Sequence, residues 1–394
     1  MPALQRIYFD HNATTPVEPA VLAAMLPFLE QDFGNASSIH SFGQHARVAV
    51  ERAREQVAAL IGARPAEIVF TSGGTEADNL AIFGLVRASR ATRKHVITTA
   101  IEHHAVLNAC QALETAGVDV TYVPVSPEGV VDPADVRRAL RPETLLASVM
   151  LANNELGTIQ PVEEIGRIVA EANVWFHTDA VQAAGKLPID VARLGVDLLS
   201  LSGHKICAPK GVGALYVRAG TRLEPLAFGG HHERDRRPGT ENVPGIVALG
   251  RAAELAIERL ASESARLAAL RDRLECGVLE RIPAARVNGG GPRVPNTTNI
   301  TFSYIEGESL VIALDLKGVA CSTGAACSSG AVEPSHVLTA IGLEPGDARA
   351  SLRFSLGHSN TVAEVDQALS ILPGVVEHLR ELSPLCPKRP VAAS

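Results

Sequence analysis

Short apolar and β-branched runs alternate with helical stretches from about residue 16 to residue 246, and this alternation constrains the fold of the 394-residue chain most. Seven runs are strand candidates, at 67–71, 95–99, 119–123, 145–150, 174–177, 197–201 and 213–217. Helical stretches separate most of them, which is the pattern of repeated βαβ units. The sequence predicts an α/β fold whose mostly parallel, seven-stranded sheet lies between helices.

The composition of the sequence and the spacing of its apolar residues change after Gly245. An Ala/Leu/Arg/Glu-rich run, 246–281, has the apolar spacing of a long connecting helix. Strand candidates at 299–303 and 352–355 then alternate with helix candidates at 308–316 and 362–377, as in a second α/β unit. We therefore predict a large domain over 16–255 and a smaller domain formed by 1–15 and 256–394.

Charge and hydropathy exclude several classes of protein. The 36 Lys and Arg residues against 43 Asp and Glu give a net charge of −7 without basic clusters, which argues against a nucleic-acid partner. The chain contains neither a signal-peptide pattern at its start nor an apolar run of about 18 residues, so we expect a cytoplasmic protein with no membrane partner. Six scattered cysteines without a CxxC pair indicate reduced thiols.

One strand candidate leads directly into a small-residue turn and a helix. The segment is EIVFTSGGTEADNLAIFGLV, and its turn runs from Ser72 to Thr75. Unpaired N–H groups and the helix dipole favour an anion at such a helix start, and glycine allows a phosphate to approach closely. The segment lacks the dinucleotide and nucleoside-triphosphate fingerprints. Taken alone, it is equally well explained as a turn with a helix cap.

Two charged residues follow later strand candidates. Asp179 ends the apolar run in ANVWFHTDAVQAAGK, where it could bind a protonated ring nitrogen or cap the next helical turn. Lys205 follows the next strand, where it is either an amine with a pKa lowered by burial or an exposed loop lysine. Parallel sheets bind ligands at the carboxyl ends of their strands, so we expect the turn, Asp179 and Lys205 to lie together. An anion cradle, a carboxylate and a lysine are what pyridoxal phosphate requires.

Motifs along nearly the whole chain support that interpretation. They include YFDHNATTPV, FGNASSIHSFG, VFTSGGTEADNLAI, IEHHAVL, NNELGTIQP, HTDAVQAAGKLPID, SLSGHKICAPKGVGALYVR, RRPGTENV, IEGESL, STGAACSSGAVEPSHVL and RFSLG. In this order they resemble the cysteine desulfurases of the nitrogen-fixation and iron–sulfur-assembly type. These enzymes belong to the aminotransferase class V family, with the fold type I of pyridoxal-phosphate enzymes.

The resemblance implies a role for each matching residue. It implies that Lys205 holds pyridoxal 5'-phosphate covalently, that Asp179 binds the ring nitrogen, that Gln182 reaches the ring hydroxyl and that His103 stacks over the ring and moves protons. Asn154 and Arg353 would orient the substrate, with Arg353 on its carboxylate and Asn154 also against the cofactor. The phosphate-binding segments would supply Gly74, Thr75, Ser202, Gly203 and His204, and the neighbouring subunit of a homodimer would supply Thr240.

Cys327 is the candidate nucleophile. It lies in CSTGAACSSGAVEP, whose Gly, Ala and Ser side chains offer little packing, as suits a thiol that must carry sulfur between sites. An ordinary thiol in a surface loop is the alternative. The resemblance also allows Cys327 to act transiently as a metal ligand, in an iron–sulfur cluster shared with a scaffold protein. Cys321, at the end of an apolar run, is expected in the core.

The expected reaction converts L-cysteine to L-alanine and leaves a persulfide on Cys327. The persulfide sulfur would pass to an iron–sulfur scaffold or another acceptor protein. A selenocysteine lyase or another class V lyase would use the same cofactor residues, and an inactive scaffold for sulfur transfer is a third interpretation. The chain departs from the usual family pattern at His104, at Pro238 and at Cys207, whose position is often aromatic.

Overall fold

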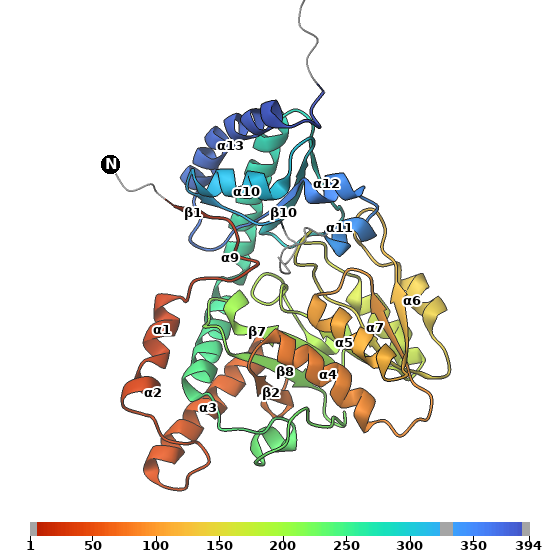
Figure 1. Ribbon diagram of the computed structural model, residues 1–394. Helices are drawn as coiled ribbons and strands as arrows, with labels where there is room; N and C mark the ends of the chain where they lie inside the picture. Colours follow the sequence, from red (N-terminus) through yellow and green to blue (C-terminus); the bar gives the residue numbers. More distant parts are fainter. Residues whose placement is uncertain (1–5, 324–333, 388–394) are drawn as a thin grey trace, which may run out of the picture.

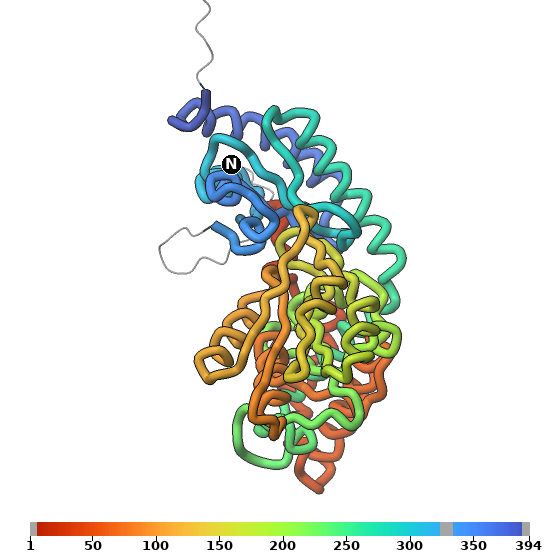
Figure 2. The backbone as a smooth tube through the Cα atoms, turned by 90° about the vertical axis from the view of Figure 1, so that its right-hand side faces the viewer, coloured from red at the N-terminus to blue at the C-terminus, as the bar shows by residue number. Residues whose placement is uncertain are grey.

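The computed structural model describes residues 6–323 and 334–387. It consists of a larger part built around one sheet and a smaller part above it, joined by the long helix α9, Val243–Arg281 (Figure 1). In the view of Figure 2, α9 runs from the smaller part down the side of the larger part. The predicted connecting helix is confirmed, and it begins three residues earlier than expected because Asn242 caps it through the Gly245 N–H.

The larger part contains the predicted seven-stranded sheet, in the order β2-β8-β7-β6-β5-β3-β4. Neighbouring strands from β7 through β6, β5 and β3 to β4 are parallel, whereas β8 is antiparallel to both β7 and β2. All seven strand candidates are confirmed within two residues. The strands are β2 Ile68–Thr71, β3 His95–Thr99, β4 Asp119–Val123, β5 Thr144–Ser148, β6 Trp175–Asp179, β7 Leu198–Ser202 and β8 Gly213–Val217.

Successive strand residues enter different cores, as the two-residue period of a strand requires. In β2, Val69 belongs to the core beneath α4 and α5, whereas its neighbour Phe70 belongs to the core beneath α3 and α9. Leu198 and Leu199 of β7 divide in the same way. Strands β2, β3, β7 and β8 are buried along their whole length and are rich in apolar residues, so the prediction of a sheet covered on both sides is confirmed.

Helices of very different lengths surround this sheet. Pro19, Pro27, Pro65 and Pro133 occupy early helical positions, where the missing N–H costs no helical hydrogen bond. The helices of the larger part are α1 Pro19–Met25, α2 Pro27–Glu30, α3 Ser41–Leu60, η1 Pro65–Glu67, α4 Gly74–Ala88, α5 His104–Thr115, α6 Pro133–Ala139, α7 Val162–Glu171, α8 Val191–Leu194, η2 Gly203–Lys205 and η3 His232–Asp235.

The smaller part has its own sheets and core. β9 Ala285–Val287, β10 Thr297–Phe302 and β12 Ser351–Ser355 form an antiparallel sheet, and β1 Ile7–Tyr8 pairs in parallel with β11 Val319–Ala320. Residues of α9 up to Leu255 enter the core of the larger part, and residues from Leu267 enter that of the smaller part. Cys321 is buried there as predicted. The helices are α10 Gly307–Asp315, α11 His336–Ala340, α12 Pro345–Arg349 and α13 Val362–Leu382.

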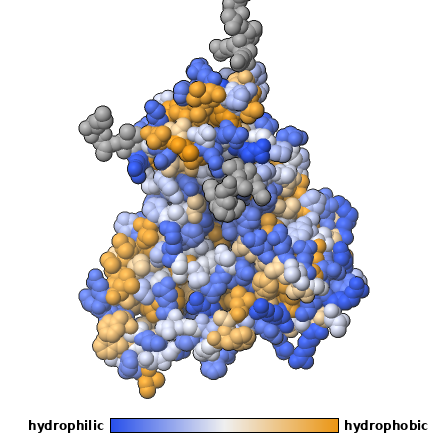
Figure 3. All heavy atoms as spheres, in the orientation of Figure 1, coloured by the Kyte–Doolittle hydropathy of each residue, from blue (hydrophilic) through white to orange (hydrophobic). Residues whose placement is uncertain are grey.

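Apolar side chains gather on the surface over α1 and α2, at the lower left of Figure 3. Leu22, Leu26, Leu29 and Phe33 are all exposed in this region. An apolar patch of this kind marks an interaction surface more often than a bare monomer surface. Within the described residues, we find no helix both long and apolar enough to cross a membrane.

Candidate active site

The carboxyl ends of β2, β6 and β7 meet beside the smaller part at a cavity of about 380 Å³, the cofactor cavity. This is where a mostly parallel sheet exposes the turns that bind ligands. All but three of the predicted site residues line it: Gly74, Thr75, His103, Asn154, Asp179, Gln182, Ser202, His204, Lys205 and Arg353.

The other three predicted site residues lie elsewhere. Gly203 is buried beneath the cavity, where a side chain would come within 2.9 Å of Val212 Cγ1. Thr240 is exposed and does not line the cavity of its own chain. Cys327 lies outside the described residues.

Lys205 projects into the cavity from η2, directly after β7. Its Nζ donates hydrogen bonds to the carbonyl oxygens of Asn12, at 2.6 Å, and Ala13, at 2.8 Å. Burial, followed by the positive charge of Arg353, lowers the pKa of Lys205 to about 8, against the opposing effect of Asp179. A substantial fraction of the amine is therefore neutral near physiological pH, as a nucleophilic lysine requires.

Asp179 ends β6 and is 5% exposed. Its Oδ1 accepts a hydrogen bond from the Val181 N–H at 2.8 Å, so it performs the capping role considered above while it also faces the cavity. Burial raises the pKa of this carboxyl, whereas His103 and Lys205 lower it. A cationic ligand atom beside Asp179 would stabilise the ionised form.

Two further buried carboxyl groups lie behind Asp179. Burial, reinforced by the charge of Asp179, raises the pKa of Asp78 on α4 well above its usual value. Burial raises the pKa of Glu102 to about 8. Burial lowers the pKa of His177 to about 3, and this neutral ring lies between Ser148 Oγ, at 2.8 Å, and Ser200 Oγ, at 3.0 Å. Burial therefore favours the uncharged forms of Asp78, Glu102 and His177 beside Asp179.

His103 lies at the N-terminus of α5. Its Nδ1 accepts a hydrogen bond from the Ala105 N–H at 3.1 Å, which fixes the proton of the neutral ring on Nε2. Burial lowers the pKa of His103, with Asp179 opposing that shift. The cavity thus contains a neutral imidazole with one fixed tautomer.

Arg353 enters the cavity from β12 of the smaller part. Its Nη2 donates to Asp10 Oδ1 at 2.7 Å and its Nη1 donates to the Asn154 carbonyl at 3.1 Å, while the buried Nε has no partner among the described residues. These two contacts orient the guanidinium, a group suited to bind a carboxylate with paired N–H donors.

Comparison with known proteins identifies the family. The profile described as aminotransferase class-V matches residues 7–368. The chain is 52% identical to a cysteine desulfurase IscS of Methanosarcina thermophila over 383 residues, covering 97% of this chain and 95% of the relative. It is also 52% identical to a cysteine desulfurase of Nostoc sp. (strain PCC 7120), covering 96% and 94% of the two chains. This chain belongs to the cysteine desulfurases of the aminotransferase class-V family.

Solved structures agree with that assignment. A NifS-like protein superposes with a TM-score of 0.90 at 39% identity, covering 95% of this chain and all of the other. A structure described as SspA in complex with cysteine has a TM-score of 0.80 at 40% identity, covering 89% and 98% of the two chains. The predicted fold class and the resemblance stated from the motifs are thereby confirmed.

The desulfurase family depends on pyridoxal phosphate, and the cofactor cavity suits that group. The helix α4 starts at Gly74 with no side-chain cap, and a Cβ on Gly74 would come 2.8 Å from Val181 Cγ2. Thr75, Ser202 and His204 surround this helix start with hydrogen-bonding groups. An uncapped helix N-terminus beside such groups is suited to a phosphate, and Asp179 and Lys205 face the same cavity.

Sequence reasoning missed several residues of the site. The Asn12 carbonyl accepts from both Lys205 Nζ and Gln182 Nε2, and Asn12 Oδ1 lies 3.2 Å from Lys186 Nζ. Burial, followed by the charges of Lys205 and Arg353, lowers the pKa of Lys186 to about 7. The signal for Asp10 and Asn12 was their place in the DHNATT turn just after the first strand, whereas Asp78 gave no local signal.

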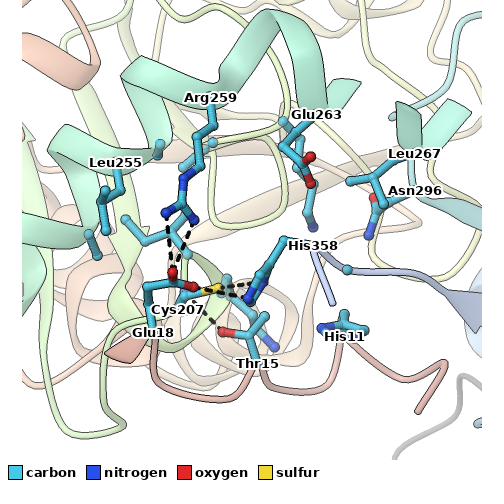
Figure 4. A pocket seen from close by; sticks show the side chains of 18 of the residues that line it. His11, Thr15, Glu18, Cys207, Leu255, Arg259, Glu263, Leu267, Asn296 and His358 are labelled. Atoms are coloured by element: carbon cyan, nitrogen blue, oxygen red, sulfur yellow. Dashed lines mark hydrogen bonds and ion pairs between the residues drawn. The ribbon is translucent and has the colours of Figure 1, made fainter. Parts of the chain in front are cut away.

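A second cavity, the rear cavity, also includes Lys205 in its wall. It has a volume of about 110 Å³ and lies between the N-terminal segment, α9 and the chain after β12 (Figure 4). Its walls are mainly apolar and include Val21, Leu255 and Leu356.

Proposed function

We propose that this chain is a cysteine desulfurase that converts L-cysteine to L-alanine with pyridoxal phosphate bound through Lys205. The observation that carries the proposal is the meeting of Lys205, Asp179, His103 and Arg353 in one cavity. These groups come from both parts of the fold. The chain also shares 52% sequence identity with each of two cysteine desulfurases.

The cofactor would be held by residues with distinct roles. Lys205 would hold its aldehyde, Asp179 its ring nitrogen and Gln182 its ring hydroxyl, with His103 over the ring. Gly74, Thr75, Ser202 and His204, with Gly203 shaping the turn, would hold the phosphate at the start of α4. When bound, pyridoxal phosphate supplies an aldehyde for amines and a ring that withdraws electrons from the substrate α-carbon.

The side chains of this enzyme would then bind and deprotonate the substrate. Arg353, positioned by Asp10 and the Asn154 carbonyl, would bind the substrate carboxylate through its remaining N–H groups. The neutral amine of Lys205 would remove the α-proton, for which its pKa of about 8 is suited. His103, with its proton on Nε2, would donate or receive a proton at that atom.

Cys327 would receive the sulfur. As the thiolate attacks the sulfur of cysteine, a sulfur–sulfur bond forms while the bond from sulfur to Cβ breaks. The electron pair left on the carbon fragment takes a proton, so the products are L-alanine and a persulfide on Cys327. A protein acceptor, such as an iron–sulfur scaffold that can share a cluster ligated by Cys327, would take the terminal sulfur.

A homodimer would complete the site. Thr240 is exposed and does not line the cavity of its own chain, which supports its contribution to the phosphate site of a partner subunit. The exposed apolar residues of α1 and α2 offer a surface for such a contact. We place the enzyme in the cytoplasm, where thiols such as Cys327 stay reduced.

The test compares the full-length holoenzyme with Cys327→Ser, using Cys276→Ser as the matched control. We expect Cys327→Ser to keep cofactor absorbance but to form alanine from L-cysteine at less than about 1% of the wild-type rate, the loss expected when a nucleophile is removed. Cys276 is exposed on α9, and its variant should keep full activity. Alanine formation at the wild-type rate by Cys327→Ser would contradict the proposal, as would a strong preference of the wild type for selenocysteine.

A further inference from the structure

Three residues from separate segments form a connected group at the rear cavity. Cys207 Sγ lies 3.6 Å from His358 Nδ1, and His358 Nε2 lies 2.9 Å from Glu18 Oε2. Figure 4 shows the side chains of Cys207, His358 and Glu18 close together, with Arg259 reaching Glu18 from α9. The order thiol, imidazole and carboxylate is the arrangement by which proteins activate a nucleophile.

The surroundings of Cys207 make the imidazole necessary for reactivity. Burial raises the pKa of the Cys207 thiol, so few molecules carry the thiolate unaided. His358 Nδ1 is placed to take the thiol proton. Glu18 Oε2 makes no hydrogen bond among the described residues, but it lies within ion-pair distance of His358 Nε2, where its charge would stabilise the imidazolium that results. Arg259 holds Glu18 in place with Nη1 and Nη2, each 3.2 Å from Oε1.

His11 supplies an independent sign that the cavity takes a ligand. Its ring is 2% exposed and lines the rear cavity, but neither ring nitrogen makes a hydrogen bond among the described residues. Burial lowers the pKa of His11 to about 4. The nearby Tyr8 carbonyl opposes this shift, but it does not have hydrogen-bond geometry with the ring. Buried polar groups normally have partners, and a cavity of about 110 Å³ exceeds the room of one water several-fold.

We propose that the rear cavity is a site of thiol modification, in which Cys207, activated by His358 and Glu18, exchanges with small disulfides that carry a hydrogen-bonding group. Cys207 sulfur attacks one sulfur of the disulfide, a new sulfur–sulfur bond forms and the original one breaks. The proton of Cys207 passes through His358 to the departing thiolate. The disulfide is the oxidant, Cys207 is oxidised to a mixed disulfide, and one small thiol is released.

The proposal goes beyond the proposed desulfurase activity and does not depend on it. Exchange at Cys207 needs neither turnover nor substrate, so it can hold even if the assignment of Cys327 fails. Alanine formation is unsuitable as the readout, because a disulfide would also modify Cys327. The readout is therefore the rate of mass gain at each cysteine, in full-length holoenzyme with Cys327→Ser.

The probe is 2-hydroxyethyl disulfide, with peptide mapping by mass spectrometry after timed quenching. Cys276 and Cys386 are the internal references, of which Cys276 is exposed. We expect Cys207 to react at least as fast as Cys276, although Cys207 is more buried. Cys207 reacting at less than a tenth of the Cys276 rate would overturn the proposal.

Variants of His358 test the role of the imidazole. His358→Asn should slow the reaction of Cys207 at least tenfold without affecting Cys276, and the exposed His378→Asn on α13 is the matched control. In His358→Ala, added imidazole should restore the reaction in proportion to its concentration, a response that a merely structural role would not give. Unchanged or faster reaction in His358→Asn, or no rescue by imidazole, would overturn the proposal.

A variant of Glu18 tests the proposal if the His358 variants fail to fold. Glu18→Gln should still slow the reaction of Cys207 with the disulfide at least threefold, and an unchanged rate would overturn the proposal.

Discussion

The two cavities that share Lys205 differ in how the chain builds them. Strand ends of one sheet supply Asp179 and Lys205 to the cofactor cavity, whereas loops and α9 supply Glu18, Cys207 and His358 to the rear cavity. In the cofactor cavity, burial shifts the pKa of several neighbouring groups at once, and backbone contacts hold them in place. Lys205 therefore lies in the wall of both the polar cofactor cavity and the mainly apolar rear cavity.

The largest expected effect follows from removing the shared lysine. We expect Lys205→Arg to reduce kcat for alanine formation by about 10³-fold or more, because Arg stays protonated and cannot remove a proton. Lys210→Arg, at an exposed position of the same loop, should keep normal activity. Steady-state assays with saturating cofactor measure both, and substantial activity in Lys205→Arg would mean that another group is the base.

A smaller loss is expected from neutralising the carboxylate at the end of β6. Asp179→Asn retains an oxygen to accept the Val181 N–H, so the strand end should keep its fold. Loss of the negative charge should lower kcat by about 10²-fold, the lower range for a group that assists proton transfer. Asp190→Asn, which changes the exposed cap of α8, is the control. Equal activity of the two variants would remove Asp179 from the mechanism.

The arginine from the smaller part should affect substrate binding more than turnover. Arg353→Lys keeps the charge but loses the fork that Asp10 and the Asn154 carbonyl orient. We expect KM for L-cysteine to rise about tenfold, which corresponds to about 1.4 kcal/mol, with a smaller change in kcat. Arg273→Lys, at an exposed ion pair with Asp366, should leave KM unchanged. A fall in kcat with constant KM would place Arg353 outside the substrate site.

The buried carboxyl behind Asp179 should be detectable in the pH dependence of stability. The folded pKa of Glu102 is raised to about 8, so the folded state binds this proton more tightly than the unfolded state. Its contribution to the free energy of unfolding is therefore present at low pH and is lost as pH rises from about 5 to about 8, by at most about 1.4 kcal/mol per unit. Glu102→Gln should remove this decline. Denaturant titrations at several pH values measure the difference, and parallel curves for wild type and variant would contradict it.

The smallest effect is expected at the rear cavity. Cys207→Ser preserves the shape of the side chain, and Cys207 does not line the cofactor cavity. We expect kcat and KM within about twofold of wild type, because conservative changes away from reacting atoms have small effects. A tenfold loss would show that the two cavities are coupled through Lys205.

Sequence periodicity predicted the framework of the site because its key residues follow strands. Asp179 and Lys205 were found at strand ends, where the sheet rule places ligands. Contacts between distant segments could not be predicted in the same way, because no local pattern brings Asn12 to Lys205 or Asp10 to Arg353. The pairing of Cys207 with His358 likewise joins positions 151 residues apart. Thr240 and Cys327 were proposed from family resemblance, and their roles remain predictions.

The central claim is that Lys205 holds the cofactor, and Lys186 offers a sharp alternative because burial lowers its pKa to about 7. Lys186 Nζ contacts Gln182 Oε1 at 2.8 Å and lines only the rear cavity, whereas Lys205 lines both. The direct measurement is borohydride reduction of the holoenzyme, which fixes the cofactor to its lysine, followed by peptide mapping. We predict the added mass on Lys205 alone. Added mass on Lys186, or none on either lysine in a protein that carries the cofactor's visible absorbance, would contradict the account.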